Sequence, residues 1–359
     1  MLVDLLDQKD SRIGVLICGH GSRHHSAIKE FASLANKIKS NLPGIPFEYG
    51  FLEFATPVIT EALDRLKAQS VERVIAIPAM LFAAGHAKND IPALLKVYSE
   101  KTGLVIEYGR ELGINSLMIG AAGARVKEAM DINSSLSCSE SLLVVVGRGS
   151  SDPDANSNVC KITRMLVEGL GMGWGETLYS GVTFPLVEPG LRYSINLGFK
   201  RIIVFPYFLF SGVLVNRILE ATNLVASENP NIQFINASYL SDHQLVVDTF
   251  LERIDEVLNG ENLMNCSLCK YRSDLLGFEN EVGTIQQSHH HHFEGINEAC
   301  SLCLSESGCV CEIEEKAEIN EDLGISHIHR TPYPHSGHPL GPVTLRTSKN
   351  QESKKNKKK

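Results

Sequence analysis

The sequence predicts an α/β protein with two tandem lobes, each a parallel sheet flanked by helices, followed by a largely irregular tail. Three observations support this fold class. Short apolar, β-branched runs alternate with amphipathic helical patterns up to about residue 260, which is typical of right-handed βαβ units and parallel strands. The same pattern occurs twice within that stretch. After Gly260 the periodic apolar segments thin out, and Cys, His, Glu and Lys become frequent.

The two halves match at a constant separation of 128 residues, without a gap. Gly19-His20-Gly21-Ser22 recurs as Gly147-Arg148-Gly149-Ser150, and each follows an apolar run. Pro57 corresponds to Pro185, residues 74–78 to residues 202–206, and residues 81–82 to residues 209–210. Several landmarks at one separation indicate an internal duplication.

In chain order, each half alternates candidate strands with helices. The run 14–18 is apolar and has the length of a buried strand, and a helical pattern follows it. In the first half we expect strands at 14–18, 46–51, 73–78 and 104–108, and helices at 24–40, 58–69, 88–102 and 116–130. In the second half we expect strands near 142–147, 176–182, 201–206 and 233–237. With a serine-rich linker at about 133–141, the expected domains are 1–135, 139–262 and the tail 263–359.

Composition narrows the class of protein. The 359 residues are 43% hydrophobic, enough for well-formed cores. No run reaches the ~18–20 apolar residues of a membrane span, and the acidic N-terminal stretch lacks the pattern of a signal peptide. We therefore expect a cytoplasmic protein without a membrane partner. The net charge of −8 argues against general nucleic-acid binding.

The duplication kept the scaffold and replaced three polar residues. His20 corresponds to Arg148, Glu53 to Gly181, and His86 to Leu214. The first-half residues follow successive expected strands, so sheet topology should bring His20, Glu53 and His86 to one rim. Two imidazoles and a carboxylate can bind a divalent metal ion or accept protons near neutral pH. Taken singly, each histidine could equally be a capping or core residue, but their joint loss from the copy favours one shared site.

The chain resembles the class II chelatases, specifically the long-form, CbiX-type sirohydrochlorin cobaltochelatases. The resemblance covers residues ~12–260. It rests on Gly19-His20-Gly21-Ser22-Arg23, on Phe51-Leu52-Glu53 with Pro57, and on residues 78–86 with Asp90-Ile91-Pro92. It implies two chelatase-like lobes and insertion of Co²⁺ into sirohydrochlorin with release of two protons, in cobalamin biosynthesis. It also implies that His20, His86 and Glu53 handle the metal and the protons.

A polycarboxylate tetrapyrrole needs cationic partners. The candidates lie in or near expected strand-end loops, although each could be an ordinary surface charge: Arg23, Lys88, Arg148, Arg192 and Arg217. Arg148 replaces a histidine, so it could have exchanged metal handling for carboxylate binding. Because one chain carries both halves, we expect a functional monomer.

Six of the nine cysteines lie in the tail. Cys266 and Cys269 form one C-x-x-C pair, Cys300 and Cys303 form a second, and Cys309 and Cys311 follow. Such pairs suit a zinc site or a [4Fe–4S] cluster, and spacing does not separate them. Long-form cobaltochelatases carry a similar M-x-C-x-x-C motif with an iron–sulfur cluster, which favours the cluster here. Histidine runs at 289–292 and 327–338 could hold Co²⁺ or Ni²⁺ weakly.

The sequence is also compatible with two other functions. Iron insertion for sirohaem would use nearly the same residues. A metal-binding protein or metallochaperone on the same scaffold, without turnover, would use the metal-binding groups alone.

Overall fold

The computed structural model describes residues 12–130 and 136–260, and it confirms two parallel sheets flanked by helices. No helix in this described part combines the length and apolarity that a membrane crossing requires. The first repeat contains β1 (Ile13–Gly19), α2 (His25–Ser40), β2 (Phe47–Phe51), α3 (Ile59–Ala68), β3 (Arg73–Pro78), η1 (His86–Asp90), α4 (Ile91–Thr102), β4 (Val105–Tyr108) and α5 (Ser116–Met130). The second contains η2 (Cys138–Glu140), β5 (Ser141–Gly147), α6 (Pro153–Leu170), β6 (Trp174–Tyr179), α7 (Val187–Ser194), η3 (Ile195–Leu197), β7 (Arg201–Pro206), α8 (Val213–Glu228), β8 (Gln233–Asn236) and α9 (Gln244–Asn259).

Each sheet has four parallel strands in the same relative order. The first runs β2-β1-β3-β4 and the second β6-β5-β7-β8. All residues of the central strands β1 and β5 are buried. Because the chain goes from β1 to β2 on one side and then to β3 on the other, the strand order reverses at β1. Open α/β sheets bind ligands beyond the carboxyl ends of the strands at such a point.

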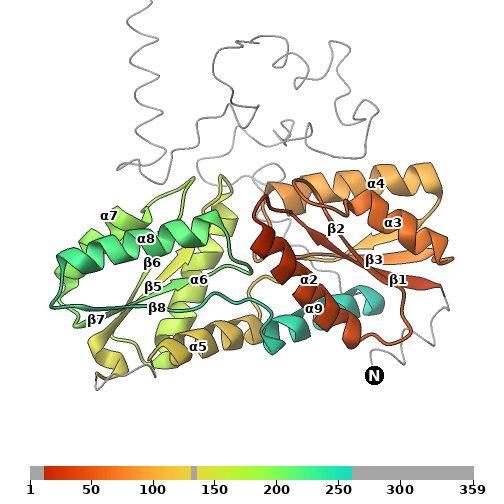
Figure 1. The fold of residues 1–359 in the computed structure, drawn as a ribbon. Helices are drawn as coiled ribbons and strands as arrows, with labels where there is room; N and C mark the ends of the chain where they lie inside the picture. The colour runs from red at the N-terminus through yellow and green to blue at the C-terminus, as the bar shows by residue number, and fades with distance from the viewer. Residues whose placement is uncertain (1–11, 131–135, 261–359) are drawn as a thin grey trace, which may run out of the picture. The chain divides into compact units, whose positions relative to one another are not determined.

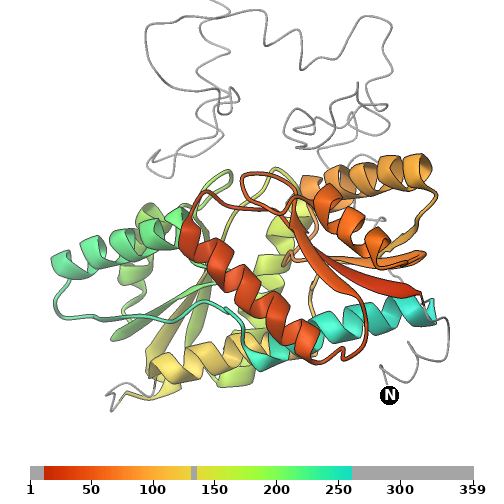
Figure 2. The same ribbon diagram turned by 45° about the vertical axis from the view of Figure 1, so that its right-hand side comes forward.

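Helices cover both faces of each sheet. In the first sheet α3 and α4 lie on one face and α2 and α9 on the other; in the second, α7 and α8 oppose α5 and α6 (Figure 1, Figure 2). Leu16 and Cys18 of β1 pack in one apolar cluster with Leu63 of α3 and Leu94 of α4. Strands covered on both faces are expected to be apolar almost throughout, which explains the apolar runs in the sequence.

The two compact units do not coincide with the two repeats. One unit contains residues 12–113 and 246–260, and the other contains the described residues from 114 to 245. Helix α5 packs against α6 and β7, so the last helix of each repeat belongs to the unit built on the other sheet. These boundaries differ from the expected domains 1–135 and 139–262, while the expected tail 263–359 lies outside the described residues.

Helix α9 is attached to the first unit through a buried arginine. Arg253 has no exposed side-chain surface. Its Nε donates to the carbonyl of Glu111 at 3.0 Å and its Nη2 to that of Leu112 at 2.8 Å. Its Nη1 pairs with Glu256 at 2.5 Å, and Glu256 also pairs with Arg110. Since the Leu112 N–H donates to the Met80 carbonyl, the arginine supports a loop that is itself bonded to the segment after β3.

Matching backbone conformations show that the repeats keep their register. Phe54 and Val182, which are 128 residues apart, have φ values of 63° and 66°. Gly21 and Gly149 have φ values of 97° and 82°. A Cβ on Gly149 would lie 1.9 Å from the carbonyl oxygen of Gly181. Glycine is required there both by the backbone angle and by the close approach of the next loop.

We predict that Gly149→Ala lowers the free energy of unfolding by about 2–4 kcal/mol, because the new methyl group meets a backbone carbonyl and φ is positive. Urea denaturation measures the effect as a lower midpoint at unchanged slope. The matched control is Gly169→Ala in α6, where a Cβ meets nothing within 4 Å and helix propensity should make alanine neutral or stabilising. Equal midpoints for the two variants would contradict the prediction.

Candidate metal site

Three side chains from successive loops meet beyond the carboxyl edge of the first sheet. His20 directly follows β1, Glu53 follows β2, and His86 begins η1 after β3. These are three neighbouring strands, with β1 in the middle. The topology therefore brings together residues that are 33 positions apart in the sequence, as the sequence analysis expected.

Backbone hydrogen bonds fix the first two loops against each other. The Leu52 N–H donates to the Gly19 carbonyl at 2.8 Å, and the Glu53 N–H donates to the His20 carbonyl at 3.0 Å. The approach is so close that a Cβ on Gly21 would lie 1.7 Å from the Glu53 carbonyl oxygen. The glycine after His20 thus permits the contact that sets His20 beside Glu53.

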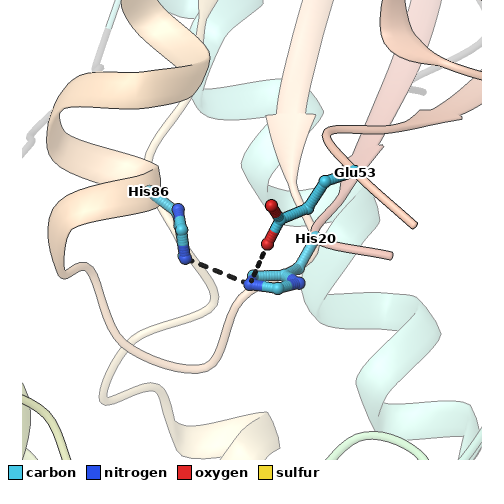
Figure 3. Close-up of side chains that lie close together, drawn as sticks. All are labelled: His20, Glu53 and His86. Carbon is cyan, nitrogen blue, oxygen red and sulfur yellow. Dashed lines mark hydrogen bonds and ion pairs between the residues drawn. The ribbon is translucent and has the colours of Figure 1, made fainter. Parts of the chain in front are cut away.

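The ligand atoms of the three side chains converge (Figure 3). His20 Nε2 lies 3.0 Å from His86 Nε2 and 3.3 Å from Glu53 Oε1. One ligand atom from each residue falls within 4.8 Å of both others. The imidazoles meet edge to face, with ring centroids 4.4 Å apart. Glu53 is buried, with 4% of its surface exposed, whereas both histidines keep about a fifth of their side chains accessible.

The other ring nitrogens have partners that orient the imidazoles. His20 Nδ1 lies 3.0 Å from the Gly21 carbonyl oxygen, and His86 Nδ1 lies 2.6 Å from Asp90 Oδ2. A carbonyl oxygen and a carboxylate oxygen both act as acceptors, so these contacts favour the tautomer with the proton on Nδ1 in each ring. Each Nε2 is then left to bind a cation. Two nitrogens bound to one metal ion at ~2.0–2.1 Å lie about 2.9–3.4 Å apart for right-angle to tetrahedral geometry, so the observed separation suits a shared cation.

The second repeat preserves the backbone of this site without its ligands. Ser180 N–H donates to the Gly147 carbonyl at 2.9 Å, matching the bond from Leu52 to Gly19. The residues that correspond to His20, Glu53 and His86 are Arg148, Gly181 and Leu214. Within the described residues, His20, Glu53 and His86 form the one group of three suited to hold a metal ion.

The expected carboxylate-binding cations fall into two sets. Arg23 is exposed, with its guanidinium carbon 4.7 Å from the Phe54 ring centroid. Lys88 lies in η1, Arg148 is exposed after β5, and Arg217 is exposed near the start of α8. All four lie in segments that begin at the carboxyl ends of strands: Arg23 and Arg148 in loops, Lys88 and Arg217 in the first turns of helical segments.

Arg192 is placed differently. It lies in the last turn of α7 and forms ion pairs with Glu188 and Glu228. Because α7 starts beyond the carboxyl end of β6, its last turn is at the opposite edge of the sheet. Arg192 therefore does not lie in a strand-end loop, since the helix continues through it to Ser194.

Asp90 has a role that was not predicted from the sequence, where it appeared only within the motif Asp90-Ile91-Pro92. This residue is 2% exposed and contacts His86 four residues earlier. Its counterpart in the second repeat is Ile218, so the duplication replaced it together with the histidine. That replacement was the signal that could have identified it. Cys266, Cys269, Cys300 and Cys303, with Cys309, Cys311 and the histidine runs, lie outside the described residues.

Known proteins resemble this chain over both repeats. The CbiX family model matches residues 14–129 and again residues 142–257. A sirohydrochlorin cobaltochelatase of Priestia megaterium is 37% identical over 264 residues, covering 73% of this chain and 85% of the relative. A sirohydrochlorin ferrochelatase of the same organism is 28% identical over 259 residues, covering 72% and 95%. The solved structure of SirB from Bacillus subtilis with Fe³⁺ is similar with a TM-score of 0.61 and 28% identity, covering 70% of this chain and 97% of SirB.

We predict that His20→Ala and His86→Ala each remove one tightly bound equivalent of Co²⁺ from the full chain, because each deletes one of three converging ligands. Equilibrium dialysis with metal analysis counts the equivalents. His25→Ala, an exposed histidine at the start of α2, is the matched control and should bind as many equivalents as the unmodified chain. A stoichiometry unchanged in both site variants would show that Co²⁺ binds elsewhere.

Proposed function

Because the chain belongs to the CbiX family, we propose that it is a sirohydrochlorin chelatase that inserts Co²⁺ into the tetrapyrrole with release of two protons. The observation that carries the proposal is the meeting of His20 Nε2, Glu53 Oε1 and His86 Nε2 at the carboxyl ends of three adjacent strands. Its relatives include both cobaltochelatases and ferrochelatases, so the family supports the reaction class, and the choice of cobalt is the finer proposal.

The three side chains supply what insertion requires. A divalent ion entering a tetrapyrrole exchanges water for pyrrole nitrogens and displaces two N–H protons. Imidazole nitrogens can hold such an ion and can then accept protons near neutral pH. The buried Glu53 carboxylate lies 3.3 Å from His20 Nε2, so its negative charge favours a cation, metal or proton, beside that ring. No nucleophile or redox group is needed for this chemistry.

Cationic side chains are proposed to hold the carboxylates of the substrate. Arg23, Lys88, Arg148 and Arg217 remain in this proposed set because they lie near the carboxyl edges of their sheets. Arginine offers two parallel N–H donors to a carboxylate, which suits a polycarboxylate ligand. We also propose that the chain works as a monomer, since it carries both repeats.

We predict that insertion of Co²⁺ into sirohydrochlorin exceeds insertion of Fe²⁺ or Ni²⁺ at matched free-metal concentration, under anaerobic conditions. His20→Ala and His86→Ala should each lower kcat/KM at least about 100-fold, as expected for loss of a group that takes part in proton transfer. His25→Ala serves again as the control. A preference for Fe²⁺ would replace cobalt by iron in the proposal. Undiminished metallation in both variants would overturn the site, and metal binding without turnover would favour the metallochaperone.

We further propose that Cys266 and Cys269, with two of Cys300, Cys303, Cys309 and Cys311, hold an iron–sulfur cluster, with zinc as the alternative metal. The two C-x-x-C pairs support this proposal. The cluster is not needed for metal insertion in our proposal, because His20, Glu53 and His86 lie in the described residues, far from the tail in sequence.

We predict that a chain ending at Gly260 keeps insertion activity within about threefold of the full chain, since both sheets and all the proposed insertion residues precede that position. The full chain, purified without oxygen, should show broad visible absorption and bound iron and sulfide, which the shortened chain should lack. Complete loss of activity on truncation would give the tail a role in insertion. A colourless full chain that contains zinc would replace the cluster by a zinc site.

A further inference from the structure

Asp90 is a buried carboxylate behind His86, on the side of the imidazole away from His20. Its side chain is 2% exposed. One oxygen, Oδ2, lies 2.6 Å from His86 Nδ1, and the other, Oδ1, accepts from Asn89 Nδ2 at 3.0 Å. Carboxylates are rarely buried so completely unless they are paired, and removing one from water costs several kcal/mol. Its position therefore requires an explanation.

The local backbone places the two side chains together. In η1 the Ile91 N–H donates to the His86 carbonyl, five residues back, so the segment 86–90 forms one wide helical turn. Such turns are rare and frequently occur at functional sites. His86 opens the turn and Asp90 closes it, which sets the carboxylate directly against the Nδ1 side of the ring.

The second repeat shows that the fold does not need a carboxylate here. The corresponding residues, Leu214 and Ile218, lie in the regular first turns of α8. Ile218 is 1% exposed and packs in the apolar core of its sheet. An apolar residue thus fills this position well when no histidine precedes it. The charge at position 90 goes with His86 rather than with the packing of the helix.

A buried tyrosine lies within electrostatic reach of Asp90. The Tyr108 hydroxyl is buried nearby, and burial above all, with help from nearby groups that include Asp90, raises the pKa of Tyr108 well above its ordinary value. The tyrosine therefore stays neutral. The group that faces His86 Nδ1 is the Asp90 carboxylate, through Oδ2.

We propose that Asp90 is a positioning residue for His86. Its carboxylate holds the imidazole in the Nδ1–H tautomer and directs the unprotonated Nε2 toward His20 and Glu53. A carboxylate that accepts from a ligand histidine fixes the ring and increases its basicity, and loss of such a partner typically costs 10–100-fold in metal affinity or activity. The inference rests on the proposed function for its effect on insertion, but the orientation of the ring can be tested without it.

The kinetic test is a double-mutant cycle in the full chain. Asp90→Asn keeps the shape of the side chain and removes its charge, and we expect kcat/KM for Co²⁺ insertion to fall about 10–100-fold. In a His86→Ala background the same change should cost less than about threefold, because Asp90 acts through the ring. An equal loss in both backgrounds would overturn the proposal. The control is Asp64→Asn, which removes a carboxylate that accepts from Tyr98 and should change kcat/KM less than about twofold.

Ring nitrogen NMR on histidine-labelled full chain gives a readout that is independent of insertion. The signals of His86 are assigned as those lost in His86→Ala. We expect Nδ1 to be protonated and Nε2 bare in the unmodified chain, and Asp90→Ala to release the ring to a mixture of tautomers. A His86 ring that keeps the Nδ1–H tautomer in Asp90→Ala would overturn the proposal. If the ring responds but insertion is absent from the unmodified chain, the proposed function fails and the positioning role stands.

A variant that copies the second repeat separates positioning from folding. His86→Leu with Asp90→Ile reproduces the pair Leu214 and Ile218, which the second repeat accommodates at the same position in α8, with Ile218 in its apolar core. We expect a urea midpoint equal to or above that of the unmodified chain, with insertion lost. A midpoint well below that of Asp64→Asn would show that the pair has a structural role, contrary to the proposal.

Discussion

The pairing of β1 with β2 continues past the ends of both strands, and the site depends on that continuation. Two further backbone hydrogen bonds, from Leu52 to Gly19 and from Glu53 to His20, keep the loops in the register of the sheet. Gly21 permits them because it carries no side chain where the Glu53 carbonyl lies. Functional loops are commonly more mobile than the elements they connect. Here strand-like backbone hydrogen bonds hold the loops that carry His20 and Glu53, which favours a preorganised cation site.

The sequence was sufficient to predict the sheets and the three converging residues, for a physical reason. Apolar runs of strand length are typical of parallel strands that are covered on both faces, and parallel strands bring their carboxyl ends to one edge. Comparison of the repeats then distinguished His20, Glu53 and His86 from scaffold residues. Chemical ligands can be lost from one copy at little cost to folding, whereas Gly21 and Gly149 are both kept because the same backbone approach occurs in both repeats.

Three features could not be predicted from the sequence: the contact of Asp90 with His86, the location of Arg192, and the sheets that α5 and α9 cover. The wide turn at 86–90 occurs without an insertion relative to the second repeat, so the sequence did not show that Asp90 would lie against His86. Arg192 was misplaced because a pattern of apolar residues does not fix where a short helix ends. The placement of α5 and α9, each in the unit built on the other repeat's sheet, could not be predicted for a different reason. The two helices occupy corresponding positions in the repeats, and the apolar pattern of a helix does not specify which sheet it covers.

That placement of α5 and α9 has a consequence for how the protein is made. The first sheet is synthesised early, yet the helix that covers part of its second face, α9, ends at Asn259. The Arg253 contacts with Glu111 and Leu112 therefore join residues more than a hundred positions apart. During synthesis on the ribosome, the compact unit that contains residues 12–113 is started first. It is completed last, because its residues 246–260 follow the whole described part of the other unit, 114–245. Domains usually fold as units during synthesis, but here the unit that contains His20, Glu53 and His86 is completed only after the last helix of the second repeat has been made.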